Sequence, residues 1–73
     1  MMDTLAPVTE AAMSYSGPWD GKGYTGLFIL PGDVHWRTCK DTAGQTVFHP
    51  TIAEAEADAG HRLVAALNRK DAA

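Results

Sequence analysis

The alternation of apolar and polar residues predicts three strands in the middle of the chain, followed by a helix. Tyr24 to Leu30 is rich in aromatic and β-branched residues, and the Pro31-Gly32 pair after it is typical of a tight turn. Asp41 to Gly44 indicates a second turn. The other two strands are expected over Asp33 to Cys39 and Gln45 to His49.

A two-residue loop at Pro31-Gly32 determines which residues of the first two strands lie opposite each other. Opposite residues share one face of a sheet, so the pairing also divides the side chains between the two faces. The face expected to pack against the helix comprises Ile29 with Val34, Leu27 with Trp36, Thr25 with Thr38, and Val47. The other face would carry Tyr24, Phe28, His35, Arg37, Cys39 and Phe48.

The helix is predicted to begin at a capping box formed by Thr51 and Glu54. In such a box the Thr hydroxyl accepts from the N3 amide, while the Glu side chain reaches back to the cap. Apolar residues then recur every three or four positions and predict one buried stripe. Acidic residues lead, basic residues follow, and Asp58 with Arg62 forms an i,i+4 ion pair. The stripe consists of Ile52, Ala55, Ala59, Leu63, Ala66 and Leu67.

Residues 1–23 are interpreted as an N-terminal arm with a Gly/Pro-rich loop, and residues 24–70 as the core domain. Within the arm, Thr9 to Met13 would form a short helical turn, or Ala11 to Tyr15 would form an edge strand. Ser16 to Gly23 is expected to be a loop. Its Trp19 either folds back to fill an open side of the core or is an exposed anchor for a partner. The predicted fold class is α+β: a three-stranded antiparallel β-meander packed against one C-terminal α-helix.

Size and composition narrow the classes of protein. A chain of 73 residues buries only about 60% of its extended surface, so a partner or a second copy would add stability. Cys39 is the single cysteine, which excludes an internal disulfide framework. We expect no membrane span and no signal peptide, and therefore a cytoplasmic protein of a bacterial cell. The net charge of −3 and the scattered basic residues favour a protein partner over nucleic acid.

The residue types that carry catalysis or bind metals do not form a recognisable motif. His35 and Cys39 are four residues apart on a predicted strand, roughly 13 Å, which is too far to share one ion. Neither His49 nor His61 completes a ligand spacing with Cys39, and no oxyanion-hole motif accompanies a Cys–His pair. The glycines between Gly17 and Gly23 lack the helix that a phosphate loop requires. We therefore expect no enzyme activity, no metal and no cofactor.

The uncovered sheet face and the acidic start of the helix are the two candidate partner surfaces. An exposed aromatic patch would mark an interaction site, and acidic side chains would meet a basic groove. Alternatively, Leu5, Val8, Met13 or Tyr15 of the arm covers this face, and the acidic residues are simply solvated. The candidate partner-binding residues are Trp19, Tyr24, Phe28, His35, Arg37, Phe48, Glu54 and Asp58.

Two resemblances add to this interpretation. The run from Phe48 to Ala55 after two hairpin strands resembles the AP2-like or N-terminal β-β-β-α DNA-binding domains of phage integrases, whose sheet enters the major groove. The resemblance covers Tyr24 to Leu67, and it implies a β-sheet DNA-binding module using Arg37 and Lys40. As a small, acidic, alanine-rich domain, the chain is also similar to phage and mobile-element accessory proteins of the anti-CRISPR type. That similarity implies binding to a host protein or ribonucleoprotein complex.

These observations lead to three hypotheses. The first is a non-enzymatic protein-binding module, in particular a phage-type, anti-CRISPR-like inhibitor that occupies a surface of a host nucleic-acid-binding complex. The second is the DNA-binding module of the integrase type. The third is a structural accessory protein that forms a homodimer. The first accounts best for the acidic charge and for the amphipathic sheet face.

Overall fold

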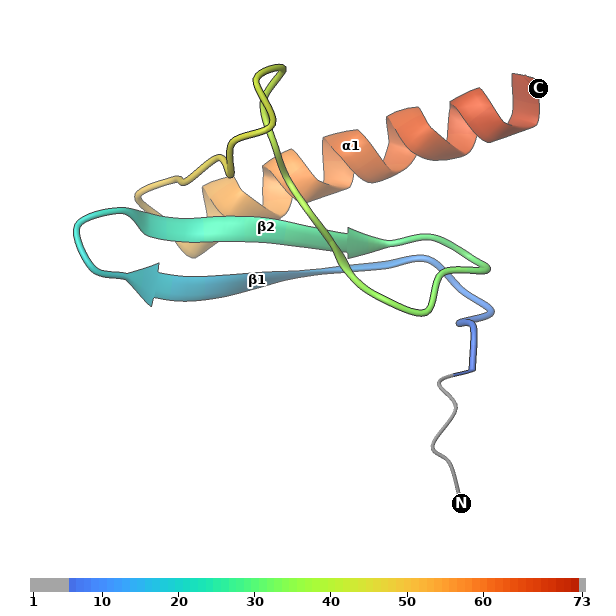
Figure 1. The fold of residues 1–73 in the computed structure, drawn as a ribbon, viewed down its shortest axis with the longest axis horizontal. Coiled ribbons are helices and arrows are strands. Elements are labelled where there is room, and N and C mark those ends of the chain that lie inside the picture. The colour runs from blue at the N-terminus through green and yellow to red at the C-terminus, as the bar shows by residue number, and fades with distance from the viewer. Residues whose placement is uncertain (1–5, 73) are drawn as a thin grey trace.

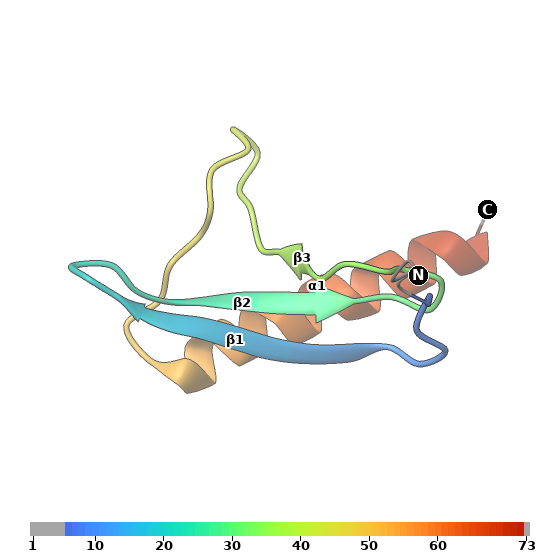
Figure 2. The same ribbon diagram turned by 60° about the horizontal axis from the view of Figure 1, so that its bottom comes forward.

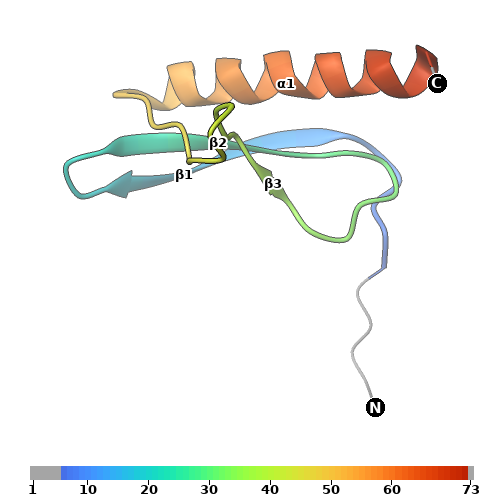
Figure 3. The same cartoon turned by 45° about the horizontal axis from the view of Figure 1, so that its top comes forward.

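The computed structural model describes residues 6–72, and it places one long helix across one face of a small antiparallel sheet (Figures 1 and 3). The described elements are β1 (Ala12–Trp19), β2 (Gly23–Ile29), β3 (Arg37–Thr38) and α1 (Ile52–Ala72). The strand order is β1-β2-β3, so consecutive strands are neighbours. Figure 2 shows β2 in the centre of the sheet. The prediction of an α+β fold with a three-stranded meander and a C-terminal helix is confirmed.

The first strand of the sheet lies in the segment that the sequence assigned to the arm. β1 pairs with β2 from Ala12 opposite Ile29 to Ser16 opposite Thr25, which confirms the edge-strand alternative. The prediction of a loop from Ser16 to Gly23 is wrong, because the pairing resumes after an irregularity and β1 reaches Trp19. Glycine and proline are tolerated here because β1 is an edge strand, where a missing N–H leaves no ladder bond unmade.

The turn at Pro31-Gly32 is confirmed, but the tight hairpin expected around it is wrong. The N–H of Asp33 donates to the carbonyl of Leu30 at 2.9 Å, and Gly32 adopts a φ of 96°. Beyond this turn the backbone bonds to Val8, which donates to Asp33 and accepts from Gly32, both at 2.9 Å. Because this segment is engaged with Val8, the ladder with β2 forms only later.

The delayed pairing shifts the register by two residues. Leu27 lies opposite Thr38 and Phe28 opposite Arg37, whereas the tight hairpin would have placed Leu27 opposite Trp36. Trp36 is left 46% exposed, so it does not belong to the core. The predicted strand over residues 33–39 therefore survives only as the two residues of β3.

The second predicted turn is confirmed, and the third predicted strand is replaced by isolated bridges. The N–H of Gly44 donates to the carbonyl of Asp41 at 3.0 Å. After this turn, Thr46 forms an isolated antiparallel β-bridge with Lys40, and His49 forms another with Tyr24 of β2. Pairing Thr46 with Lys40 displaces the expected register by one residue. A one-residue displacement moves each side chain to the other face, so Phe48 joins the side of Thr38.

The sheet face that packs against α1 is the opposite of the one predicted. A Cβ atom on Gly26 would lie 2.3 Å from the carbonyl oxygen of Ala55 and 3.0 Å from Cβ of Ala59. The helix therefore lies directly on Gly26, and its neighbour on this face, Phe28, is buried. Phe28 forms the core with Cys39, Ala59 and the partly buried Leu63. Leu27 consequently faces away from α1.

The helix itself follows the prediction closely. Thr51 precedes Ile52, and its Oγ1 accepts from the Glu54 N–H at 3.1 Å and donates to the Glu54 carboxylate at 3.1 Å. The capping box is thus confirmed, although the Glu54 side chain accepts from the Thr51 hydroxyl instead of the cap N–H. Ala55, Ala59 and Ala66 are buried, as the apolar stripe predicted, while Ile52 is 36% exposed.

Candidate functional site

The face of the sheet that points away from α1 carries a cavity of about 350 Å³, which we call the open-face pocket. Its floor is built from cross-strand pairs, Ser16 with Thr25 and Leu27 with Thr38. The end of β1, the turn after it and the segment before α1 complete the walls. The full lining is Ser16, Trp19, Lys22, Thr25, Leu27, Thr38, Thr46 and Phe48.

Two aromatic side chains border the open-face pocket. Trp19 is 52% exposed at the end of β1, so the interpretation that it folds back to fill the core is wrong. Phe48 is partly buried, and the Nζ of Lys22 lies 5.4 Å from the centroid of its ring. This cation–π contact ties the turn after β1 to the segment before the helix. An exposed indole beside a concave apolar surface is the arrangement found at binding hot spots.

The floor of the open-face pocket contains an unusual polar atom. Thr25 is only 4% exposed, and its Oγ1 has no hydrogen-bond partner among the described residues. A buried hydroxyl without a partner is unfavourable by about 1–3 kcal/mol. The hydroxyl-bearing residues Ser16, Thr38 and Thr46 line the same pocket around Leu27. The pocket is therefore suited to a side chain that is apolar in its body and polar at its tip.

Two aromatic residues predicted to bind a partner belong to the other face. Phe28 is 9% exposed and lies in the core beneath α1, so placing it on a free surface was wrong. Tyr24 is half-buried, with its ring edge against Tyr15 at a centroid distance of 6.0 Å. Met13 and Tyr15 do lie on the side of Phe28 and Tyr24 that they were expected to cover, but they are neighbours within the sheet, and it is α1 that covers this face. Leu5 lies outside the described residues.

Arg37 lies in β3 and His35 precedes this strand, and neither residue lines the open-face pocket. Arg37 is exposed, and its guanidinium binds Asp33 through Nε at 2.8 Å and Nη2 at 3.0 Å. The hydrogen bonds that Arg37 donates to this carboxylate raise the pKa of Arg37 above its usual value. His35 is exposed on the segment between β2 and β3.

The two acidic candidates on α1 have partners within the chain. Glu54 belongs to the helix cap, as described above. Asp58 is half-buried and accepts from His49 Nε2 at 2.9 Å and from Arg62 Nε at 2.7 Å. Burial acts to raise the pKa of Asp58, but the hydrogen bonds from His49 and Arg62 outweigh it and hold the pKa below the usual value. The predicted i,i+4 pair of Asp58 and Arg62 is confirmed.

Trp19 and Phe48 are the two predicted partner-binding residues that line the open-face pocket. Its other lining residues were not among the predicted ones. Thr25, Leu27 and Thr38 were assigned to the buried face, although the sequence correctly placed them on a common face. Lys22 lies within the segment from Ser16 to Gly23 that the sequence predicts to be a loop. The sequence pattern does not indicate which face the helix covers. The available signal was Gly26, because a strand residue without a side chain allows a helix to approach closely.

The described residues give no indication of a metal centre or a membrane span. Within residues 6–72, no three His, Cys, Asp or Glu side chains come close enough to hold an ion. Cys39 is fully buried, and this burial raises the pKa of its thiol, which keeps it protonated and unreactive. In the same part of the chain, no helix combines the length and apolar character needed to cross a bilayer.

Comparison with known proteins finds no relative: no protein family, no curated protein and no solved structure significantly matches this chain. The function is therefore inferred from the geometry of the described surface.

Proposed function

We propose that the protein is a non-enzymatic protein-binding module that docks through the open-face pocket. The observation that carries this proposal is the half-exposed Trp19 beside a cavity floored by Leu27 and bordered by Phe48. Tryptophan contributes a large apolar area with little conformational freedom to lose, which is why it dominates many interfaces. A partner side chain that fills the cavity would bury the exposed surface of all three side chains at once.

The partner side chain should combine an apolar body with a hydrogen-bonding tip. The hydroxyls along the floor would supply the polar contacts, and a donor or acceptor of the partner would pair with Thr25 Oγ1. Pairing this oxygen in the complex removes an unfavourable term present in the free protein. The complex is therefore favoured both by the new hydrogen bond of Thr25 and by the burial of apolar surface.

In its specific form, the proposal is a phage-type inhibitor that occupies a surface of a host nucleic-acid-binding complex. The small size, the net charge of −3 and the absence of enzyme motifs in the sequence support it. Surfaces that bind nucleic acid are basic, so an acidic module is attracted to them. The exposed aromatic anchor would then hold the complex after the charges have brought the partners together.

Binding of DNA through the sheet has weaker support. Lys22 is the only cation among the residues lining the open-face pocket, and its amine already lies over Phe48. Arg37, which the integrase resemblance would use, points to the helix side and binds Asp33. A duplex-binding sheet needs several phosphate contacts, which this face does not offer.

The test is affinity capture from bacterial lysate, with and without nuclease, using the wild type, Trp19→Ala and Trp36→Ala. Trp36 is a matched control because it is 46% exposed, against 52% for Trp19, and lies outside the pocket lining. We expect the wild type and Trp36→Ala to capture a partner protein, and this capture should survive nuclease treatment. The affinity of Trp19→Ala for the same partner should be at least tenfold lower.

Two results would contradict the proposal. If Trp19→Ala captures the partner as well as Trp36→Ala does, the open-face pocket is not the docking site. If capture disappears after nuclease treatment, the contact runs through nucleic acid, and the integrase-type alternative gains support. Circular dichroism of both variants establishes that the fold is intact.

A further inference from the structure

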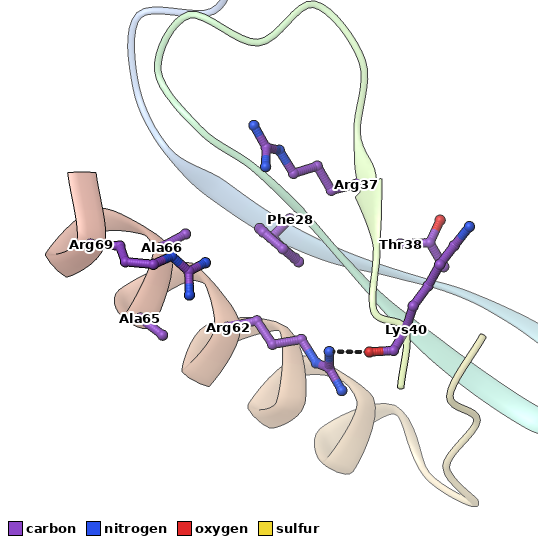
Figure 4. Close-up of a pocket in the computed structure, with 8 residues that line it drawn as sticks. All are labelled: Phe28, Arg37, Thr38, Lys40, Arg62, Ala65, Ala66 and Arg69. Carbon is purple, nitrogen blue, oxygen red and sulfur yellow. Dashed lines mark hydrogen bonds between the residues drawn. The ribbon is translucent and has the colours of Figure 1, made fainter. Parts of the chain in front are cut away.

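A second cavity of about 350 Å³ lies on the helix side of the sheet, between the C-terminal half of α1 and β3 (Figure 4). We call it the basic pocket. Phe28, Ala65 and Ala66 supply its apolar surface, and the remaining residues are mostly cationic. Its lining consists of Phe28, Arg37, Thr38, Lys40, Arg62, Ala65, Ala66 and Arg69.

The basic pocket gathers positive charge in an otherwise acidic protein. Arg37, Lys40, Arg62 and Arg69 are four of the six basic residues of a chain whose net charge is −3. In the sequence these residues are scattered over more than thirty positions. Only the packing of α1 against the sheet brings them to one cavity. Charges of one sign repel each other, so their collection here requires an explanation.

Two of the arginines are held in place and still have donors to offer. Arg37 binds Asp33 through Nε and Nη2, which leaves Nη1 without a bond in the described chain. Arg62 binds Asp58 through Nε and the Lys40 carbonyl through Nη1, which leaves Nη2. A guanidinium oriented by one carboxylate loses less conformational freedom when it binds a second anion. Both side chains are thus prepared for an additional oxyanion.

The third arginine has no such restraint. Arg69 is exposed and makes no hydrogen bond or ion pair within residues 6–69. It lies seven residues after Arg62, which is two helical turns or about 10.5 Å along the same side of α1. In Figure 4, the guanidinium group of Arg37 lies above Phe28 and that of Arg69 to its left, one from the strand and one from the helix, while that of Arg62 points to the Lys40 carbonyl. The Lys40 amine points away from α1 in this view.

The charge and the directions of the donors indicate the class of ligand. Three arginines against the two bonded carboxylates, Asp33 and Asp58, leave an excess of one positive charge, since the Lys40 amine points away from α1; Asp41 acts on Arg62 at longer range, without a hydrogen bond. A phosphomonoester carries a charge of about −1.5 to −2 at pH 7 and three outward oxygens. Donors that approach from both α1 and β3 suit this tetrahedral group better than a planar carboxylate.

We propose that the basic pocket binds a small phosphomonoester, with the phosphate between Arg37, Arg62 and Arg69 and the organic body against Phe28 and Ala66. The volume is at the lower end of the range for small-molecule sites. A nucleic-acid strand fits less well, because the overall negative charge opposes a polyanion beyond the pocket. This site is on the opposite face from the open-face pocket and does not depend on the proposed docking function.

The experiment measures binding of AMP, inorganic phosphate and uncharged adenosine to the full chain by calorimetry at one ionic strength. We expect AMP to bind most tightly, inorganic phosphate at least tenfold more weakly, and adenosine not to bind in the same range. Arg69→Gln should weaken AMP binding at least tenfold without changing the thermal midpoint of the free protein, because Arg69 has no hydrogen-bond or ion-pair partner among residues 6–69. Lys22→Gln makes the same charge change on the other face and should leave AMP affinity unchanged.

Each contrary result overturns the proposal in a defined way. Absence of AMP and phosphate binding at millimolar concentration removes the site. Equal losses with Arg69→Gln and Lys22→Gln mean that only net charge matters. Phosphate binding as tight as AMP binding removes the role of the organic body. A single-stranded oligonucleotide that binds much more tightly than AMP, with a steep salt dependence, identifies a nucleic-acid site instead. None of these outcomes changes the result expected when partner capture is compared between the wild type and Trp19→Ala.

Discussion

Thr25 shows how one residue can relate stability to binding. Its hydroxyl lies beneath the open-face pocket, is almost inaccessible to water and has no hydrogen-bond partner in the part of the chain that the structure describes. Neighbouring backbone groups of β2 are already used in the ladder with β1 and β3. A purely structural threonine at this place would be replaced by valine with an advantage in stability. A polar group kept at such a disadvantage is consistent with a surface that awaits a partner.

The first prediction concerns this hydroxyl. Thr25→Val should raise the free energy of unfolding by about 1 kcal/mol, because the side chain keeps its shape and loses an unsatisfied oxygen. For a domain of this size, that corresponds to a rise of roughly 4–8 °C in the thermal midpoint. Urea denaturation of the wild type and the variant measures it. A drop in stability would show that an ordered water satisfies Thr25 Oγ1 in the free protein.

At the scale of elements, the contact between α1 and β2 organises the fold. The alanine ridge of the helix lies on the bare backbone of Gly26, which places Phe28 and Cys39 in the core and turns Leu27 outward. The same contact positions Arg62 and Arg69 above β3 and so creates the basic pocket. Both candidate sites therefore depend on how closely one helix approaches one strand.

The second prediction compares two glycines on this interface. Gly26→Ala should destabilise the protein by about 3 kcal/mol, because the new Cβ would lie 2.3 Å from the backbone oxygen of Ala55. Gly60→Ala should instead stabilise it by up to about 1 kcal/mol, since the nearest atom is the Sδ of the flexible, exposed Met13 at 3.2 Å. Chemical denaturation of both variants tests the pair. Equal changes in the free energy of unfolding for the two variants would mean that α1 can move away from β2 without loss of stability.

At the scale of the whole molecule, Asp58 joins segments that the sheet leaves loosely connected. It binds His49 just before the helix and Arg62 within it, while Arg62 also donates to the carbonyl of Lys40. The segment between β3 and α1 contains only isolated bridges, so these side-chain bonds fasten it to the rest of the fold. This network also orients one donor of the basic pocket.

The third prediction is a pH dependence that arises from Asp58. The pKa of Asp58 is lower in the folded protein than its ordinary value, so the folded state binds fewer protons than the unfolded state. The contribution of Asp58 to stability is therefore complete above the unfolded-state pKa of about 3.9, and it is lost as the pH falls through the lower, folded-state pKa. Asp58→Asn should be less stable than the wild type at pH 6, and the difference should shrink below pH ~4.

Urea unfolding of the two proteins between pH 6 and pH 2.5 provides the measurement. A gap between wild type and Asp58→Asn that stays constant down to the lowest pH would show that the pKa of Asp58 is not depressed. An Asp20→Asn control, which removes an exposed carboxylate in the turn after β1, corrects for the change in net charge.

Local features were predictable from the sequence because their partners are close along the chain. The helix cap, the turns at Pro31-Gly32 and Asp41 to Gly44, and the Asp58–Arg62 pair each join residues three or four positions apart. The fold class also followed, because one helix and a set of amphipathic strands have few ways to bury their apolar surface in so small a chain.

The tertiary structure alone decided which sheet face is core, which strand comes first and where the cations gather. A strand of alternating residues is equally regular on either face, and β2 carries apolar residues on both. The choice follows from a long-range fit, in which the alanines of α1 come close only where Gly26 lacks a side chain. The same fit exposes the pocket beside Trp19 and brings Arg37 to Arg62 and Arg69. Contacts between segments so distant in sequence have no periodicity from which they can be read.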